Sequence, residues 1–258
     1  MNFKTLRVQA TDQITTVSLN RPNARNSMNS EMITELAALV EELRGDAATR
    51  AVILTGAGRV FSAGADVEML TRIGETYTPE QTRAEICKWR AAFDALEALP
   101  QVTIAAVNGL AFGGGVVLAL ACDFRLASSR AIFGLPEIKL GMVLALGGTQ
   151  RLARLVGASA AKEMILRGRN VTAIEAQRLG LVHRVSDPGD LMGLAHSWAE
   201  RAVQNSPRAI ALAKRLIDQS FERDANASAE AETAAQVELL HSPEFLGRVR
   251  SLKESGEI

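Results

Sequence analysis

The chain has 258 residues, of which 47% are hydrophobic, a balance that supports one globular domain of moderate size or one domain with a short appendage. Its 29 basic and 29 acidic side chains cancel, which argues against a general nucleic-acid or membrane-surface binder, because such a protein needs a basic excess. Cys87 and Cys122 form no disulfide framework and the N-terminus has no apolar signal-peptide core, so we expect a cytoplasmic protein.

Strands and helices alternate through the first half of the chain. Short alternating or apolar runs predict strands at residues 5–10, 14–19, 51–54 and 102–107. Helical spacing of apolar residues predicts a helix that Ser30 caps and Gly45 stops. A second helix carries Ile86 and Trp89 on its apolar face and ends at Pro100.

The second half begins with the same alternation and ends in helices. A glycine-rich turn leads into an apolar helix at residues 116–121, and short strands are expected at residues 124–127 and 131–133. From Gly148 onward the pattern is helical except for one strand at residues 182–185. The sequence therefore predicts an α/β core followed by a helical C-terminal part.

Residues 102–122 are nearly free of charge and have the length of a membrane span. Asn108, Gly109 and the three glycines at 113–115 would interrupt a spanning helix, and no basic flank marks its cytoplasmic end. We therefore expect a buried strand and helix here and no membrane partner.

Two of the predicted strands are each followed by a glycine-rich loop and a helix. The loops run over residues 55–66, where Asp66 can cap the next helix, and over residues 108–115. Small residues let a ligand approach the backbone, and free N–H groups at a helix start can donate to a negative oxygen. Two such loops can direct two donors at one point and form an oxyanion hole. Plain strand-to-helix turns and tight helix–strand packing are the alternatives.

A dinucleotide site is a competing interpretation of the first loop. Gly56 and Gly58 follow a strand, but Phe61 occupies the third glycine position of the dinucleotide motif. No acidic strand end follows about twenty residues later, so the sequence disfavours this site.

Glu137 lies among apolar residues directly after a proline. Desolvation there would raise the pKa of its carboxyl toward values useful in acid–base catalysis. A solvated loop glutamate or an ion pair with Lys139 is the alternative. The scattered His183, His196 and His241 lack metal-ligand spacing, so we interpret them as structural or surface residues and expect no metal site.

Taken together, these segments resemble the crotonase (enoyl-CoA hydratase/isomerase) family over nearly the whole chain. The segments that carry the resemblance are Asn20-Arg21-Pro22, residues 26–29, Ser62-Ala63-Gly64-Ala65-Asp66, Val107-Asn108-Gly109, Gly113-Gly114-Gly115, Ala121-Cys122-Asp123, Phe133-Gly134 with Pro136-Glu137, Gly147-Gly148-Thr149-Gln150-Arg151, and Ala176 with Gly180-Leu181-Val182. Their order and spacing are far more specific than any single motif.

The resemblance implies an α/β fold, a crotonase-like spiral of ββα units with a helical C-terminal trimerisation region. On this basis we expect a core over residues 1–190 that carries the acyl-CoA site and a helical region over residues 191–258. The implied partner is an acyl-CoA thioester, with coenzyme A as part of the substrate and no separate cofactor. The implied assembly is a homotrimer or a dimer of trimers.

The resemblance also assigns roles to individual residues. Ala65 and Gly114 match the two backbone N–H donors of the family's oxyanion hole, and Glu137 matches one of its catalytic glutamates. Ala63 matches a residue whose carbonyl meets the adenine, and Arg25 is chemically suited to a phosphate. The expected substrate-binding set is Ala24, Arg25, Ala63, Gly64, Ala65, Asp66, Gly114 and Val117.

Several positions depart from the family pattern. The other catalytic glutamate of the family's hydratases would fall at Val117, which can neither transfer a proton nor hold water. Leu144 and Ala145 replace a usual Pro-Gly, and Ala145 also replaces an acidic residue that some isomerases and dehalogenases use. The C-terminus after Phe245 is shorter than usual and lacks a late aromatic residue.

One glutamate suffices to remove a proton at one carbon and return it at another, so we expect double-bond isomerisation of an enoyl-CoA, with Glu137 as base and then acid. A single-glutamate hydratase or lyase and a different acyl-CoA reaction are the alternatives. A non-catalytic acyl-CoA-binding protein is an alternative of another class.

Overall fold

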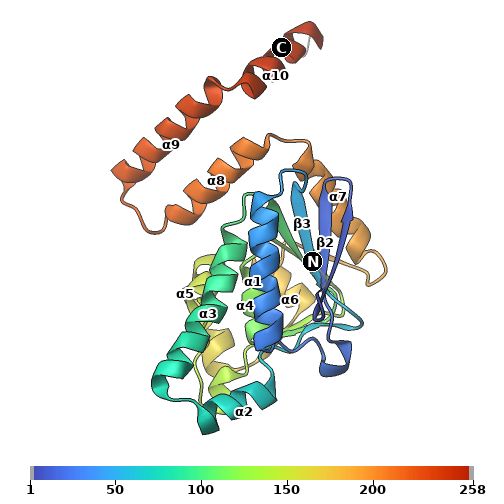
Figure 1. Cartoon of the computed structure of the whole chain (residues 1–258), viewed down its shortest axis with the longest axis vertical. Helices are drawn as coiled ribbons and strands as arrows, with labels where there is room; N and C mark the ends of the chain where they lie inside the picture. The colour runs from blue at the N-terminus through green and yellow to red at the C-terminus, as the bar shows by residue number, and fades with distance from the viewer. Residues whose placement is uncertain (1–2, 256–258) are drawn as a thin grey trace. The chain divides into compact units, whose positions relative to one another are not determined.

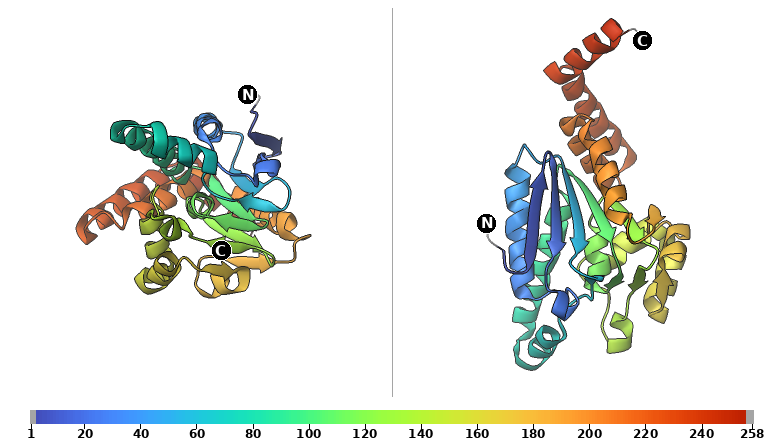
Figure 2. Two further views of the ribbon diagram at one scale, coloured as in Figure 1. Left: turned by 90° about the horizontal axis from the view of Figure 1, so that it is seen from below. Right: turned by 90° about the vertical axis from the view of Figure 1, so that its right-hand side faces the viewer.

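The computed structural model describes residues 3–255 and divides into two compact units, one up to Ala202 and one from Val203 onward (Figures 1 and 2). The first unit holds the strands of the described chain, and the second is helical. Every predicted site residue lies in the first unit.

Two sheets form the framework of the first unit. Among residues 3–255 the larger sheet has six strands in the order β1 (Leu6–Thr11), β2 (Ile14–Leu19), β3 (Ala51–Gly56), β5 (Val102–Val107), β7 (Phe124–Ser128) and β10 (Arg184–Ser186). The smaller sheet has four strands in the order β4 (Val60–Ser62), β6 (Leu110–Phe112), β8 (Ile132–Gly134) and β9 (Asn170–Thr172). The pairs β1–β2 and β8–β9 are antiparallel, and the other neighbours are parallel.

Successive repeats place one strand in each sheet and then turn into a helix. Strands β3 and β4 lead to α2 (Val67–Thr76), and β5 and β6 lead to α4 (Gly114–Leu120). Strands β7 and β8 lead to the 3-10 helix η2 (Glu137–Leu140) and then to α5 (Gly148–Arg167). Because β3, β5 and β7 are parallel neighbours, the loops that follow them emerge at one edge of the sheet. The α/β spiral of ββα units is confirmed.

The central strands are apolar along their whole length because both of their faces are covered. Every residue of β3 and β5 is buried, and the register pairs Ala51 with Val102 and Leu54 with Ala105. This pattern of continuous burial is typical of parallel strands between helices.

Helices α1 (Ser30–Gly45) and α3 (Pro79–Glu97) lie side by side against the larger sheet (Figure 1). Leu36 of α1 and Phe93 of α3 belong to the same buried cluster as Leu54 of β3. The remaining helical elements of this unit are η1 (Pro22–Ala24), α6 (Ala173–Arg178) and α7 (Leu191–Val203), whose last residue begins the second unit.

The apolar stretch at residues 102–122 forms β5, β6 and α4 rather than one long helix. Every residue of α4 is buried, which explains its lack of charge. Within residues 3–255 no helix combines the length and apolar character that crossing a bilayer requires.

Local predictions at helix ends and on short strands needed correction. The side chain of Asn29, not Ser30, caps α1 by accepting a hydrogen bond from the Met32 N–H at 3.0 Å. Helix α3, for which the sequence predicted only the apolar face and the end at Pro100, begins at a capping box between Thr78 and Gln81 and ends at Glu97, and its Ile86 is exposed rather than buried. Strands β4, β6 and β9 have three residues each, too few for a clear alternation pattern.

The second unit contains α8 (Pro207–Gln219), α9 (Ala225–Leu240) and α10 (Pro243–Ser255). An ion pair between Arg208 and Glu238 at 2.5 Å joins α8 to α9. Large apolar side chains such as Ile217, Phe221 and Val237 are more than half exposed, at 64%, 59% and 54%.

Candidate active site

The two glycine-rich loops are held together by backbone contact and by one amide side chain. Asn108, after β5, donates to the carbonyl oxygens of Gly56 and Gly58 at 2.9 and 3.0 Å and accepts from the Gly56 N–H at 3.2 Å. A Cβ on Gly109 would lie 2.0 Å from the Arg59 carbonyl oxygen, so only glycine allows this approach. The loops after β3 and β5 are therefore fixed to each other near their starts.

A buried asparagine attaches the segment after β2 to the loop that follows β3. The Asn26 side chain is fully buried and donates to the carbonyl oxygens of Ala57 and Val60 at 2.9 and 2.7 Å. Its Oδ1 accepts from the Arg21 N–H at 2.9 Å. Each of these polar contacts is made away from water, so the loss of any one would leave a costly unpaired group.

A backbone bridge presents the N–H of Ala65. The Met28 N–H donates to the Gly64 carbonyl oxygen at 2.7 Å, and the Met28 carbonyl oxygen accepts from the Asp66 N–H at 2.8 Å. In this parallel bridge the Ala65 N–H points away from Met28. Among residues 3–255 no acceptor is recorded for it.

The second N–H comes from the start of α4. Gly114 is the first residue of this helix, so its N–H has no acceptor within the helix. Gly113 before it has a φ of +49°, and its N–H donates to the Gly134 carbonyl oxygen at 2.9 Å. The position of a Cβ on Gly114 is 3.8 Å from the Ala65 nitrogen, so the two donors are neighbours. The structure thus brings the two predicted donors, Ala65 and Gly114, close together.

The Glu137 carboxyl lies next to this pair of donors. Its Oε1 is 2.5 Å from the position that a Cβ on Gly113 would occupy, and the φ of +49° at Gly113 also disfavours a side chain there. Its Oε2 is buried and has no hydrogen-bond partner among residues 3–255. Burial raises the pKa of the Glu137 carboxyl above its ordinary value. The structure records no ion pair between Glu137 and Lys139 within the described residues, so the surface alternative is not supported.

The carboxyl of Asp66 is engaged in fixing the loop. It caps α2 by accepting from the Glu68 N–H at 3.1 Å, as predicted, and it pairs with Arg21 Nη1 at 2.8 Å. Burial raises the pKa of Asp66, but hydrogen bonds from Arg21 and Ser27 outweigh burial and leave this pKa below its ordinary value. An ionised, fully engaged carboxylate is suited to hold the Ala65 peptide and poorly suited to carry protons.

The segment with Ala24 and Arg25 runs beside the first loop. The Arg25 carbonyl oxygen accepts from the Ala63 N–H at 3.0 Å. The backbone of Arg25 has a φ of +53°, and its side chain is exposed. Ala24 is half-buried at the end of η1. Ala63 and Gly64 thus connect Arg25 to the Ala65 donor within two residues.

Val117 is fully buried on the first turn of α4. A Cβ on Gly148 would lie 2.6 Å from Val117 Cγ2 and 2.9 Å from Leu144 Cγ, so these three residues are packed together. Apolar side chains therefore surround Val117, the position at which the family's hydratases carry their other catalytic glutamate.

Two residues at the donors were absent from the sequence-based set. Met28 Cε lies 2.9 Å, and Leu146 Cδ1 3.9 Å, from the Cβ position of Gly114. Leu146 has a φ of +58°, which no sequence pattern indicates for a leucine. Met28 lies within residues 26–29, and its segment was recognised without a role for the side chain.

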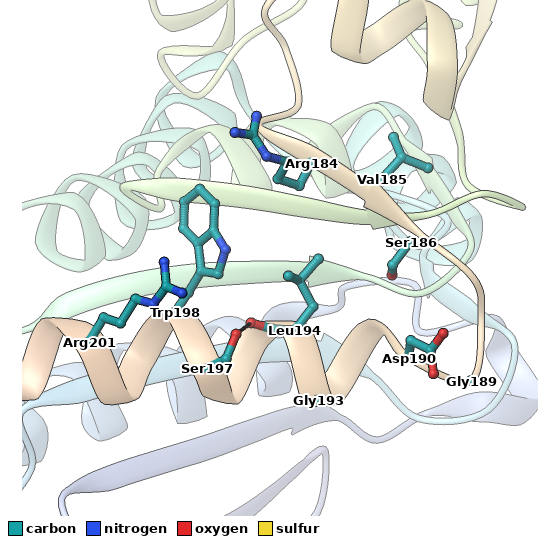
Figure 3. A pocket seen from close by; sticks show the side chains of 10 residues that line it. All are labelled: Arg184, Val185, Ser186, Gly189, Asp190, Gly193, Leu194, Ser197, Trp198 and Arg201. Carbon is teal, nitrogen blue, oxygen red and sulfur yellow. Dashed lines mark hydrogen bonds between the residues drawn. The ribbon is translucent and has the colours of Figure 1, made fainter.

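A concavity of about 610 Å³ lies on other elements, between β10 and α7 (Figure 3). Arg184, Ser186, Trp198 and Arg201 are among the side chains that line it. None of the predicted site residues takes part in it.

The chain is similar in sequence and in structure to known proteins. The sequence profile of a family described as enoyl-CoA hydratase/isomerase matches residues 9–254. The short-chain-enoyl-CoA hydratase of Clostridium acetobutylicum is 40% identical over 236 residues, which cover 91% of this chain and 89% of that protein. A crystal structure of an enoyl-CoA hydratase from Bacillus anthracis matches with a TM-score of 0.92 and 38% identity and covers 98% of this chain and 97% of that one. A structure from Thermobifida fusca YX in complex with acetoacetyl-CoA matches with a TM-score of 0.84 and 33% identity, over 92% and 94% of the two chains.

The raised pKa of Glu137 predicts a pH-dependent effect of Glu137→Gln on stability. A carboxyl with a raised folded-state pKa supports the fold fully below its unfolded pKa of about 4.3, and this support is lost as the pH rises through the folded pKa. The variant should therefore gain stability relative to the parent as the pH rises, as measured by urea unfolding between pH 4 and pH 8. The exposed Glu75→Gln is the control, and a difference that does not change with pH would contradict the burial of this charge.

Proposed function

Because the chain belongs to the enoyl-CoA hydratase/isomerase family, we propose that it binds an acyl-CoA thioester and stabilises the enolate formed from it. The observation that carries the proposal is the proximity of the backbone N–H groups of Ala65 and Gly114, for which residues 3–255 offer no recorded acceptor, to the partly buried carboxyl of Glu137. The thioester oxygen would accept from the two N–H groups while Glu137 exchanges protons with the acyl carbons.

The two donors act where negative charge grows during the reaction. When a proton leaves the carbon next to the thioester, its electron pair moves onto the thioester oxygen. The N–H groups of Ala65 and Gly114 are held by backbone contacts and need no reorganisation to stabilise this oxygen. Removing one donor of this kind from an enzyme typically raises the barrier by about 3 kcal/mol.

Double-bond migration is the reaction that a single carboxyl supports best. The Glu137 carboxylate takes a proton from C2 of a 3-enoyl thioester, and the resulting dienolate is held at its oxygen. The Glu137 carboxylic acid then returns the proton to C4, which leaves the double bond between C2 and C3. A pKa that burial raises above its ordinary value favours both steps, because the group must be a base first and an acid second.

Hydration of a 2-enoyl thioester is the second candidate. The observation in its favour is that the Clostridium acetobutylicum and Bacillus anthracis relatives are named enoyl-CoA hydratases. Glu137 would then have to take a proton from water and also supply one to C2. The buried Val117 offers no second group for this work, and this residue is the reason that we place isomerisation first.

The nucleotide part of coenzyme A would lie along the segment that adjoins the first loop. The exposed Arg25 offers a guanidinium to a phosphate, and the backbone of Ala24 and Ala63 runs beside it. This placement is supported by the Ala63–Arg25 hydrogen bond, which connects the segment to Gly64 and the Ala65 donor.

A 3-enoyl-CoA assay tests the proposed reaction directly. We expect the parent protein to convert 3-hexenoyl-CoA to 2-hexenoyl-CoA faster than it forms 3-hydroxyhexanoyl-CoA. Glu137→Gln should lower kcat by about 10² to 10⁴-fold with KM nearly unchanged, since the side chain keeps its shape and loses proton transfer. The control is Glu75→Gln. Faster hydration than isomerisation would select the second candidate, and thioester binding without any turnover would indicate a binding protein.

Val117→Glu tests whether the missing second carboxyl limits hydration. The side chain is buried against Leu144 and Gly148, so the single variant should hydrate 2-hexenoyl-CoA weakly and lose roughly 2 kcal/mol or more of stability. Val117→Glu with Leu144→Ala should hydrate faster than either single variant, because the carboxyl gains room. Equal hydration rates in all four proteins would show that this position does not decide the chemistry.

We also propose that the helical second unit joins copies of the chain into a homotrimer or a dimer of trimers. The exposed apolar side chains of Ile217, Phe221 and Val237 support this, since such residues are normally covered. Sedimentation at micromolar concentration should give the mass of three or six chains, and a monomer would contradict the proposal.

A further inference from the structure

A buried arginine on α5 connects helix α3 to the loop before α5. Arg151 has only 5% of its side chain exposed. Its Nη2 lies 2.6 Å from Asp94 Oδ1 and 2.5 Å from Glu97 Oε2, and its Nε donates to Glu97 Oε1 at 3.0 Å. The remaining nitrogen, Nη1, donates to the Leu146 carbonyl oxygen at 2.9 Å. All three guanidinium nitrogens are therefore engaged, and one of them holds the loop.

The loop that Arg151 holds has an unfavourable backbone conformation. Leu146 and Gly147 have φ values of +58° and +75°, and the left-handed region is disfavoured for leucine because of its Cβ. A Cβ on Gly147 would lie 2.4 Å from Arg151 Nη1, so the glycine makes room for the guanidinium. Thr149 Oγ1 donates to the Leu144 carbonyl oxygen at 2.6 Å and secures the other end. Side-chain donors, rather than local preference, keep Leu146 in this conformation.

The conformation places the Leu146 side chain at the oxyanion donors. Leu146 Cδ1 and Met28 Cε lie 3.9 and 2.9 Å from the Cβ position of Gly114. Apolar side chains beside Gly114 reduce the room for water near the N–H groups, and in a drier site such donors act more strongly on a developing negative charge.

We propose that Arg151 is a positioning residue for catalysis, which holds Leu146 in the left-handed conformation so that its side chain closes the site over the N–H of Gly114. Leu146 is the group that contacts the acyl thioester, and Arg151 acts through it. This inference rests on the proposed enolate chemistry and adds two residues that neither the resemblance nor the sequence pattern assigned.

The alternative is that Arg151 only stabilises the fold by joining α3 to α5. The two roles differ in one respect: a purely structural arginine would change stability and leave the effect of Leu146 on the reaction unaltered. The Asp94 and Glu97 side chains are 43% and 37% exposed, so water can solvate both carboxylates when the guanidinium is removed. We therefore expect Arg151→Met to fold.

The test is a double-mutant cycle with Arg151→Met and Leu146→Ala, read out by exchange of the C2 protons of butyryl-CoA in D2O. Exchange reports enolate formation alone and is independent of the choice between isomerase and hydratase. Each single variant should lower kcat for exchange by about 10- to 100-fold with KM changed much less, as expected when a catalytic group is slightly misplaced. The double variant should be no slower than the slower single variant, and Arg151→Lys should recover part of the rate.

The matched control is Arg167→Met on the same helix, whose side chain is 70% exposed and pairs with Glu163 at the surface. It should leave the exchange rate unchanged. Rate losses that multiply in the double variant, or an Arg151→Met protein with the parent's kcat, would overturn the positioning role. If Arg151→Met does not fold, Leu146→Ala and Arg151→Lys still decide the matter: parental rates in both would overturn it. A parent that exchanges no C2 protons would overturn the proposed function and this inference together.

Discussion

The close approach of two backbone segments, Gly64–Ala65 and Gly113–Gly114, is the constraint on which the site depends. An oxyanion needs two N–H groups directed at one oxygen, and backbone groups achieve this only if their chains nearly touch. Cβ atoms would prevent it: one on Gly64 would lie 2.7 Å from the Phe112 carbonyl oxygen, and one on Gly115 would lie 2.6 Å from that of Ser62. The glycines are therefore required by the contact between loops as well as by the helix start.

The ionisable groups around the site differ in whether their charge is paired with an opposite charge. Asp66 is paired with Arg21, and the carboxylates of Asp94 and Glu97 are paired with Arg151, so each of these charges is compensated. Glu137 differs, because one of its oxygens is buried without a partner in the described chain and its pKa is raised. A protein tolerates such a costly arrangement where an uncompensated carboxyl is of use, and in the proposed function that use is proton transfer.

The apolar packing around α4 limits what this carboxyl can do. The buried side chains of Val117 and Leu144 fill the space against Gly148. The buried face of α4 thus presents apolar side chains here and no second acid or base. The chain belongs to the enoyl-CoA hydratase/isomerase family, and in the proposed enolate chemistry the choice of reaction depends on Val117, Leu144 and Glu137.

The sequence by itself determined the strands of the larger sheet, the α/β class and the loops that carry the site. The apolar runs of β3 and β5 and the glycines after them have local signatures, and the family resemblance that the motifs carry pointed to Ala65, Gly114 and Glu137. Other features depend on contacts between distant segments and have no local signature. The three-residue strands β4, β6 and β9 exist because neighbouring strands pair with them. Leu146 is left-handed because Arg151 holds its carbonyl oxygen, and Met28 reaches Gly114 because Asn26 fixes the segment before it. Only the tertiary structure decides such positions, because the stabilising partner lies in another part of the fold.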